Sequence, residues 1–374
     1  MKIAFDVAYI QKARAGLGRF AAEILRGLLA ARTEDEFVLH GWSLSLDIEE
    51  IRRLGGTGVD YSVRRIPGLV KREYWNRLPF PPIETIVGMC DVFHSMDPFL
   101  PPLRKARGIA TVHDLAQRKF PGFFERNVLK WEKHIHRSLD RAAAIVVPSN
   151  QTRDDLLEAY HIDENKIHRV HVPVNPLFRQ QPDPETEERT RVKYALSYPF
   201  VLFADTLEPR KNIVRLVQAF QLVADSSSLP VHLLLAGKRG WMYEGILQAI
   251  RSSDVRNRIH LLEHVTDAEL ASLYRQARVF AYPSLYEGHG SPVVEAMASG
   301  IPVVTSNSSS LRELASGAAE LIDPERVEDI AGAITSLLGD DSRRRHLIAS
   351  GLERARLYSH SVAAGEVLRV YHTV

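Results

Sequence analysis

The segment YPSLYEGHGSPVVEAMASG, residues 282–300, carries the strongest structural signal in this chain. It follows an apolar run, Val279 to Tyr282, which predicts a buried strand. Pro283 ends that run, and a loop containing Gly288 and Gly290 comes next.

A short helix is predicted directly after this loop. Ser291 supplies an N-cap oxygen, and Pro292 stands where a first helical residue is expected. The helix should cover residues 292–298 and end at Gly300. The whole segment therefore reads as strand, glycine loop and helix N-terminus.

This arrangement suits a ligand that carries both phosphates and hydroxyls. A helix N-terminus preceded by glycines offers free N–H groups and a partial positive charge to a phosphate. Glu287 in the loop and Glu295 in the helix would repel a phosphate alone, but they can accept hydrogen bonds from sugar hydroxyls. A nucleotide sugar meets both conditions. On spacing alone an equal alternative stands, in which Glu295 stabilises its own helix and Glu287 is a solvated charge.

The two glutamates also carry a family resemblance. They form an E-x7-E pattern in a segment similar to YEGFGLPVLEAMASG of the retaining family 4 glycosyltransferases, although His289 stands where a Phe is usual. The next residues, IPVVTSNSSSLREL at 301–314, resemble the following strand and turn of that family. The resemblance favours the functional interpretation of Glu287 and Glu295.

Length and composition fit a soluble enzyme. The chain has 374 residues, enough for two α/β domains, with 45% hydrophobic and 25% charged residues. A single cysteine, Cys90, excludes an intrachain disulfide and a cysteine-based metal cluster. The N-terminal residues MKIAFDVAY predict a strand rather than a secretory signal, so we expect a cytoplasmic protein.

Positive charge is concentrated between Arg64 and Ala142, where the sequence contains fifteen Lys and Arg but only eight Asp and Glu. Apolar residues such as Tyr74 and Phe80 are interspersed there. Such a surface suits peripheral contact with an anionic membrane or a phosphorylated acceptor. The alternative, which we favour, is a solvated face over ordinary core residues. We expect no nucleic-acid partner.

A first glycine loop, AGLGRF, follows a predicted strand at residues 2–7 and precedes a helix predicted over 19–31. Gly16, Gly18 and Ala21 formally spell the G-x-G-x-x-A dinucleotide fingerprint, which raises a nicotinamide-dependent oxidoreductase as an alternative. The fit is poor, because the fingerprint turns directly after its strand. The family resemblance instead implies that Gly16 and Gly18 lie near the donor phosphate.

The rest of the first half alternates strands and helices. IATVHDL, residues 109–115, predicts a strand that ends in His113, at the edge where parallel sheets bind ligands. A histidine satisfied by its neighbour is equally consistent with this position, whereas the resemblance implies that His113 lines the sugar pocket. A long helix is predicted over 122–141. The histidines lack partners at metal-ligand spacing, so we expect no metal site.

Residues 179–193, RQQPDPETEERTRVK, are polar and predict a linker. Strand and helix signals then resume, which predicts a second parallel sheet. We expect a first Rossmann-like domain at 1–178, a second at 194–357, and a last segment at 358–374 that the resemblance implies crosses back onto the first domain.

A cationic cluster, DTLEPRKN at 205–212, follows the second domain's first strand. Arg210 and Lys211 lie beside a predicted helix start, where cations are unfavourable unless an anion compensates them. Together they suit a diphosphate. Many family members carry an Arg five residues before the Lys, where this chain has Thr206. Val265, in LEHV after a later strand, is expected by resemblance to offer backbone bonds to the base.

These patterns predict an α/β protein with the GT-B fold, in which two Rossmann-like parallel-sheet domains face each other across a cleft. The expected activity is retaining, metal-independent transfer of a hexose from a nucleotide-diphosphate sugar to a glycan or lipid-linked acceptor. Expected donor-binding residues are Gly16, Gly18, Arg210, Lys211, Val265, Gly288, His289, Gly290, Ser291 and Glu295, and expected catalytic residues are His113 and Glu287.

The donor and the activity have alternatives. GDP-mannose, used in surface polysaccharide synthesis, is the expected donor, with UDP-glucose and UDP-N-acetylglucosamine as competitors. A catalytically silent binding subunit should have lost Arg210, Lys211 or a glutamate of the pair, and all four residues are present.

Overall fold

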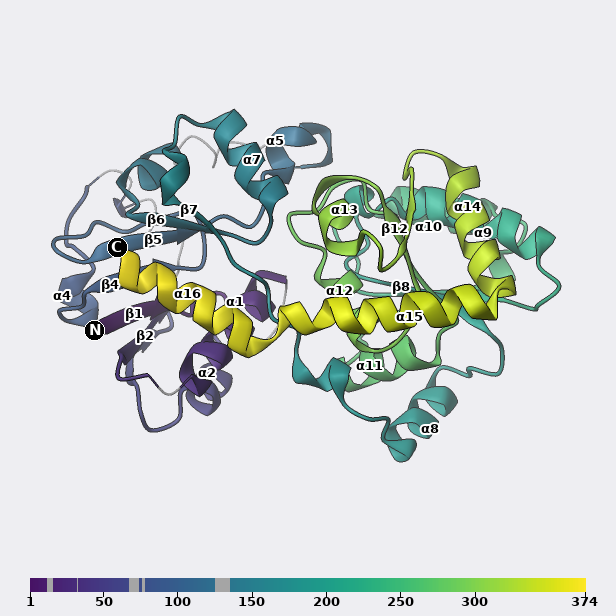
Figure 1. Cartoon of the computed structure of the whole chain (residues 1–374), viewed down its shortest axis with the longest axis horizontal. Coiled ribbons are helices and arrows are strands. Elements are labelled where there is room, and N and C mark those ends of the chain that lie inside the picture. The colour runs from purple at the N-terminus through teal and green to yellow at the C-terminus, as the bar shows by residue number, and fades with distance from the viewer. Residues whose placement is uncertain (12–15, 32, 67–73, 76–77, 125–134) are drawn as a thin grey trace. The chain divides into compact units, whose positions relative to one another are not determined.

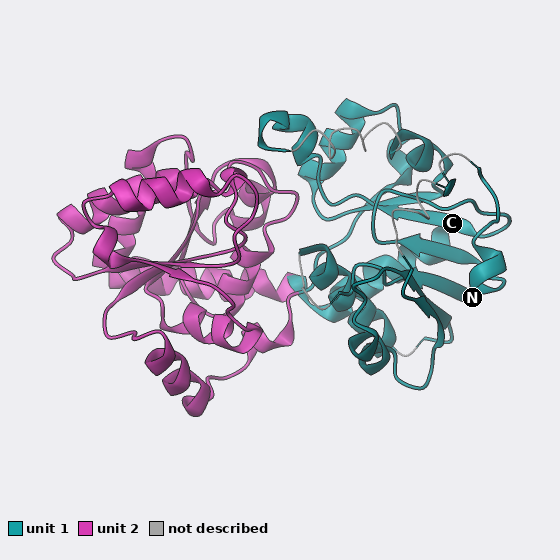
Figure 2. Ribbon diagram, turned by 180° about the vertical axis from the view of Figure 1, so that it is seen from behind, with its two compact units in different colours: residues 1–173, 358–374 teal, residues 174–357 magenta. Residues whose placement is uncertain are grey.

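The computed structural model describes residues 1–374 except 12–15, 32, 67–73, 76–77 and 125–134. It divides into two compact units (Figure 2). Unit 1 comprises Met1–Pro173 and Tyr358–Val374, and unit 2 comprises Val174–Leu357. Residues 174–193, expected at the end of the first domain and in the linker, therefore group with unit 2.

Unit 1 contains a parallel sheet with the strand order β3-β2-β1-β4-β5-β6-β7 (Figure 1). Its described strands are β1 (Lys2–Asp6), β2 (Glu36–Trp42), β3 (Asp60–Arg64), β4 (Val92–Ser95), β5 (Arg107–Thr111), β6 (Ala144–Val147) and β7 (Ile167–Arg169). Its described helices are α1 (Gly16–Ala30), α2 (Ile48–Gly55), α4 (Glu84–Val87), α5 (Ala116–Lys119), α7 (Asn150–Ala159) and α16 (His360–Thr373).

The two faces of this sheet bury separate cores, because successive side chains of a strand point to opposite faces. Ile3 and Phe5 of β1 join the core formed with α1 and α16. Ala4, between them, joins the core on the other face with Leu156 of α7. The last helix, α16, packs against α1 (Figure 1).

Unit 2 repeats the architecture with the strand order β10-β9-β8-β11-β12-β13. Its strands are β8 (Phe200–Ala204), β9 (His232–Ala236), β10 (Ile259–Leu262), β11 (Val279–Tyr282), β12 (Val303–Ser306) and β13 (Glu320–Ile322). Its helices are α8 (Pro184–Lys193), α9 (Ile213–Ser226), α10 (Glu244–Ser252), α11 (Asp267–Gln276), α12 (Ser291–Ala298), α13 (Ser309–Ala315), α14 (Val327–Gly339) and α15 (Asp341–Ala355). In Figure 1, α9, α10 and α14 lie on one side of the sheet and α11, α12 and α15 on the other.

The predicted linker was wrong over residues 184–193, which form α8. Asp183 caps this helix by accepting from the Thr186 backbone N–H, and Pro184 stands at its start. Ion pairs hold it against α11, since Arg275 donates twice to Glu187. A helix fixed by polar contacts has no apolar stripe, which is why the sequence suggested a linker.

Two further helix predictions need correction. Residues 125–134 of the helix predicted over 122–141 lie outside the described residues. Pro121–Phe123 forms a short 3₁₀ turn, Phe124 is extended, and residues 135–141 are helical. Gly16 and Gly18 lie inside α1 and not in a loop before it.

Candidate active site

The candidate site lies at the carboxyl edge of the unit 2 sheet, between β8 and β11. These strands are neighbours in the sheet, and the strand order reverses direction there. In open parallel sheets such a switch point is where ligands bind, because the loops leaving the two strands diverge. The short 3₁₀ turn Pro209–Lys211 follows β8, and the loop containing Glu287 follows β11.

Glu287 joins the two loops, and it is buried. Its Oε1 accepts from Lys211 Nζ (2.7 Å) and from Ser284 Oγ (2.6 Å). Its Oε2 accepts from Arg210 Nη1 at 2.8 Å. Burial opposes ionisation of this carboxyl, but Arg210 and Lys211 outweigh it and lower the pKa of Glu287 to about 2. The structure thus brings together three residues that were chosen from two distant motifs.

Protein carboxylates compensate the two cations, so a bound anion is not needed to explain their position. Arg210 Nη2 donates to Glu208 at 2.7 Å, and Lys211 Nζ lies 2.6 Å from Asp205 Oδ2. Burial alone would lower the pKa of Lys211, whereas Asp205 and Glu287 raise it, which keeps the ammonium charged.

Tyr282 and Asp205 also contact Lys211, and neither was among the expected site residues. The fully buried Tyr282 hydroxyl accepts from Lys211 Nζ (2.8 Å) and lies 2.6 Å from Asp205 Oδ2 and 2.9 Å from Glu287 Oε1. Burial, followed by the two carboxylates, raises the pKa of Tyr282 well above its usual value. The only sequence signal for this pair was its position at the ends of the two central strands.

The loop of residues 288–290 is held by the first two residues of α13. Ser309 Oγ accepts from the Glu287 backbone N–H (3.0 Å), and Ser310 Oγ donates to the carbonyls of Glu287 (2.8 Å) and His289 (3.0 Å). Gly290 has a φ of 93° and is the N-cap of α12. Ser291, predicted as that cap, is instead the first helical residue.

Glu295 lies in the second turn of α12, and it is buried. Its Oε2 accepts a long hydrogen bond (3.4 Å) from the Tyr274 hydroxyl on α11. Val265 lies between β10 and α11, half-buried, beside His264 with a φ of 57°. The expected contacts of Glu295 with a ribose and of Val265 with a base stay predictions.

His113 follows β5 at the carboxyl edge of the unit 1 sheet. Its Nε2 donates to the Met96 carbonyl at 2.9 Å, because a carbonyl oxygen can only accept. Burial lowers the pKa of His113, so the ring is neutral and Nδ1 is its acceptor. Gly18 lies against the Tyr9 carbonyl, which any Cβ at position 18 would strike. This close backbone contact explains why position 18 is a glycine, and no bound dinucleotide is needed to account for it.

The described ranges contain neither a candidate metal site nor a candidate membrane-spanning helix. Among the described residues, no three His, Cys, Asp or Glu side chains are grouped as a metal site would require. In the described part of the chain, no helix is both long and apolar enough to cross a membrane.

Comparisons with known proteins identify the family of this chain. The family description "Glycosyl transferases group 1" matches residues 185–354, and "Glycosyltransferase Family 4" matches residues 14–176. The chain is 30% identical to the O-antigen chain mannosyltransferase B of Escherichia coli over 388 aligned residues, covering 99% of both proteins.

Solved structures share the fold at lower identity. Sucrose-phosphate synthase from Thermosynechococcus elongatus superimposes with a TM-score of 0.76 at 20% identity, over 100% of this chain and 98% of that one. Anabaena HepE in complex with UDP-glucose superimposes with a TM-score of 0.75 at 15% identity, over 100% of both chains. With two matching family descriptions and a relative aligned over its whole length, this chain belongs to glycosyltransferase family 4 and has the GT-B fold.

Proposed function

We propose that this glycosyltransferase moves mannose from GDP-mannose to a glycan or lipid-linked acceptor in surface polysaccharide synthesis, with retention of configuration and without a metal. The observation that carries the site assignment is the convergence of Arg210, Lys211 and Glu287 at the switch point of unit 2. The mannose assignment rests on the relative named O-antigen chain mannosyltransferase B.

The cations supply the electrostatic part of this proposal. Arg210 offers a planar fork and Lys211 a point charge to the diphosphate, whose negative charge grows as the glycosidic bond breaks. In transferases that use a divalent metal, the metal neutralises this charge. Here the buried Lys211 and the partly buried Arg210, beside a helix start, would take that role.

The carboxylates and His113 orient the sugars. Glu287 would accept hydrogen bonds from the hydroxyls of the transferred sugar, and Glu295 from those of the ribose. His113 would accept a hydrogen bond from one sugar hydroxyl at Nδ1, because its Nε2–H already donates to the Met96 carbonyl. Gly16 and Gly18 in unit 1, and Gly288, His289, Gly290 and Ser291 in unit 2, would allow backbone approach to the donor. For retention we adopt same-face attack, with the leaving phosphate as proton acceptor.

UDP-glucose is the second candidate donor, because HepE, which shares the fold, was solved with it. A thermal-shift panel of GDP, UDP, ADP and TDP separates the candidates, since a ligand of the folded state raises its apparent stability. We expect GDP to raise the Tm most. A larger shift with UDP would overturn the GDP assignment.

Donor hydrolysis without acceptor tests the enzyme assignment against a silent binding subunit. Wild type should release nucleotide from GDP-mannose, and Glu287→Ala should release at least about a hundredfold less, since orienting groups of this kind contribute several kcal/mol. Nucleotide release by neither protein with any donor would favour the silent subunit.

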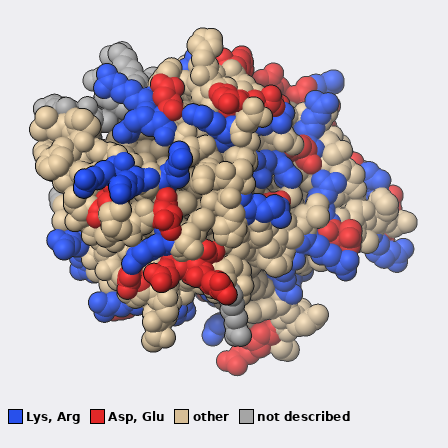
Figure 3. Space-filling model, turned by 60° about the vertical axis from the view of Figure 1, so that its left-hand side comes forward, with Lys and Arg blue, Asp and Glu red and all other residues tan. Residues whose placement is uncertain are grey.

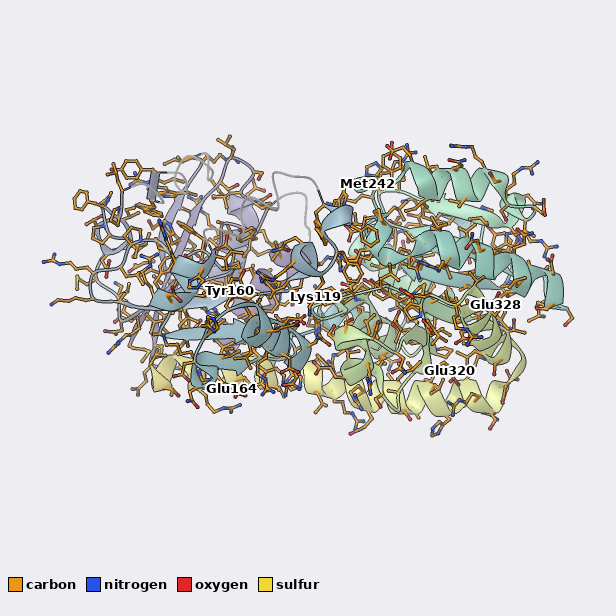
Figure 4. All side chains as sticks on the ribbon, turned by 90° about the horizontal axis from the view of Figure 1, so that it is seen from above. Lys119, Tyr160, Glu164, Met242, Glu320 and Glu328 are labelled. Carbon is orange, nitrogen blue, oxygen red and sulfur yellow. The ribbon has the colours of Figure 1, made fainter. Side chains whose placement is uncertain are left out.

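We also propose a cytoplasmic location, and we keep peripheral contact with an anionic membrane through the basic region of residues 64–142 as the alternative to the solvated face favoured above. Leu78 and Phe80 are 55% and 66% exposed there. Lys119, labelled in Figure 4, pairs with Asp155 and Glu158 and so adds little free charge. On the face drawn in Figure 3, basic and acidic side chains are interspersed. Co-sedimentation with phosphatidylglycerol vesicles, absent with phosphatidylcholine alone, is the result expected of that alternative.

A further inference from the structure

The site cluster has a charge imbalance that affects how a donor can bind. The cluster, defined as Asp205, Glu208, Arg210, Lys211 and Glu287, holds three carboxylates and two cations. With all five ionised, its net charge is negative. Every member is at least half-buried, since the exposed side-chain fractions run from 2% for Glu208 to 23% for Asp205.

A nucleotide sugar adds a diphosphate with two negative charges, neither of which binds a proton near neutral pH. Placing a dianion in a buried site that is already negative is unfavourable, because like charges interact strongly where water is excluded. Either a carboxylate leaves the cluster or one of them takes up a proton.

Glu208 is the carboxylate best placed to take up that proton. Its Oε1 accepts from Arg210 Nη2 at 2.7 Å, and in the proposed function Arg210 binds the diphosphate. Glu208 is 2% exposed, and the backbone of Gly240 in the loop after β9 lies against it. A Glu208 carboxylate that lost Arg210 would be a buried, poorly paired charge.

The other two carboxylates are held more firmly. Asp205 contacts Lys211, the Tyr282 hydroxyl and the Thr206 backbone N–H. Glu287 accepts from two cations and Ser284, and its pKa is about 2. By contrast, burial together with the neighbouring carboxylates Asp205 and Glu287 raises the pKa of Glu208, although Arg210 and Lys211 lower it.

The charged groups around Glu208 come from four segments of unit 2. Arg210 and Lys211 face it from its own turn, and Asp205 and Glu287 from the ends of β8 and β11. In the loop after β9, Lys238 and Arg239 are exposed, and Arg239 pairs with Glu263. These exposed cations are screened by water and do not replace Arg210 as a partner.

We propose that donor binding takes up one proton from solvent and that the carboxylate of Glu208 receives it. This inference rests on the proposed function of the cluster as the diphosphate site. Protonation removes one of the two ionic partners of Arg210 and makes its Nη2 side available to the diphosphate, while Nη1 keeps its pair with Glu287. Donor affinity should therefore weaken as pH rises, by up to about tenfold per pH unit for one linked proton.

Isothermal titration calorimetry measures this proton directly. GDP-mannose, and in parallel UDP-glucose, is titrated without acceptor in two buffers of equal pH and different ionisation enthalpy. A nucleotide sugar is the right probe, because a free nucleoside diphosphate carries a terminal phosphate that itself titrates near neutral pH. Wild type should take up about one proton per donor bound.

Glu208→Gln imitates the protonated carboxyl and should bind the donor with no proton uptake. Its affinity should stay constant over the pH range in which wild-type affinity weakens. Glu187→Gln is the matched control, because Glu187 also pairs with an arginine, Arg275, on α11. It should behave as wild type.

The outcomes separate the inference from the proposed function. Wild type that binds a donor without proton uptake, or Glu208→Gln with the same uptake as wild type, would overturn the inference alone. Wild type that binds neither donor would overturn the proposed function and the inference with it. If Glu208→Gln does not fold, the proton count and pH dependence of wild type still decide.

Discussion

Replacing Lys211 should destabilise unit 2 more than replacing Glu287, although both residues belong to one ion pair. In Lys211→Met the ammonium is lost, and with it contacts of 2.7 Å to Glu287, 2.6 Å to Asp205 and 2.8 Å to the Tyr282 hydroxyl. The single Tyr282 proton cannot satisfy both carboxylates. Breaking a buried pair in this way costs about 3–5 kcal/mol.

Glu287→Gln removes one negative charge from a cluster that has more carboxylates than cations. The amide oxygen of the glutamine can replace Oε1 and still accept the hydrogen bonds from Lys211 and Ser284. The amide NH₂ then replaces Oε2 and cannot accept the hydrogen bond from Arg210 Nη1. One charge-assisted hydrogen bond is lost, a cost of about 1.5–3 kcal/mol that relief of carboxylate repulsion partly offsets. We expect a net loss below about 2 kcal/mol.

Hydrogen exchange of peptides from β8 and β11 suits this comparison, because it reports the stability of unit 2 separately. Lys193→Met is the control: Lys193 is 46% exposed in its pair with Glu269, so the change should cost under about 1 kcal/mol. If Glu287→Gln destabilised unit 2 as much as Lys211→Met or more, the charge balance derived for the cluster would be refuted.

Three further predictions concern pH, the glycine loop and the last helix. Folding lowers the pKa of Glu287 from 4.5 to about 2, so the stabilisation from its ionised form is present above pH 4.5 and is lost as pH falls toward 2. Acid unfolding of wild type should steepen there, and Glu287→Gln should lack this component. Gly290→Ala should cost more than about 2 kcal/mol in urea unfolding, because φ is 93° and a Cβ would press on Leu311; a cost below 1 kcal/mol would contradict the geometry. Glu366→Gln should lower the Tm of unit 1, since Glu366 accepts from the His171 backbone N–H (2.7 Å) and contacts the His171 ring (2.8 Å). An unchanged Tm would mean that these two contacts do not stabilise unit 1.

The fold was largely predictable because its strands are buried on both faces and read as apolar runs. Val201–Phe203 in β8 and Val279–Ala281 in β11 are fully buried, and both strands were expected from such runs. The edge strand β3 was missed, because its sequence DYSVR carries no apolar run and most of its residues are at least partly exposed. Helix α8 was missed for the related reason that polar contacts fix it.

The sequence indicated several residues of the site, but it did not indicate which of them form ion pairs with one another. Glycine and helix-start patterns indicated Glu287, Arg210 and Lys211, because loops at strand ends carry local signals. Which carboxylate pairs with which cation depends on β8 and β11 being adjacent strands. The sequence does not indicate this, because the two strands lie far apart along the chain. Asp205 and Tyr282 were therefore missed, and the need for an external anion was overestimated.

A crystal structure of the protein with GDP-mannose tests the central claim most directly. The account predicts diphosphate oxygens within about 3 Å of Arg210 and Lys211, as charge-assisted hydrogen bonds require, with a hydroxyl of the mannose on the Glu287 carboxylate. A diphosphate bound away from both cations, with their pairs to Glu208 and Glu287 unbroken, would contradict it.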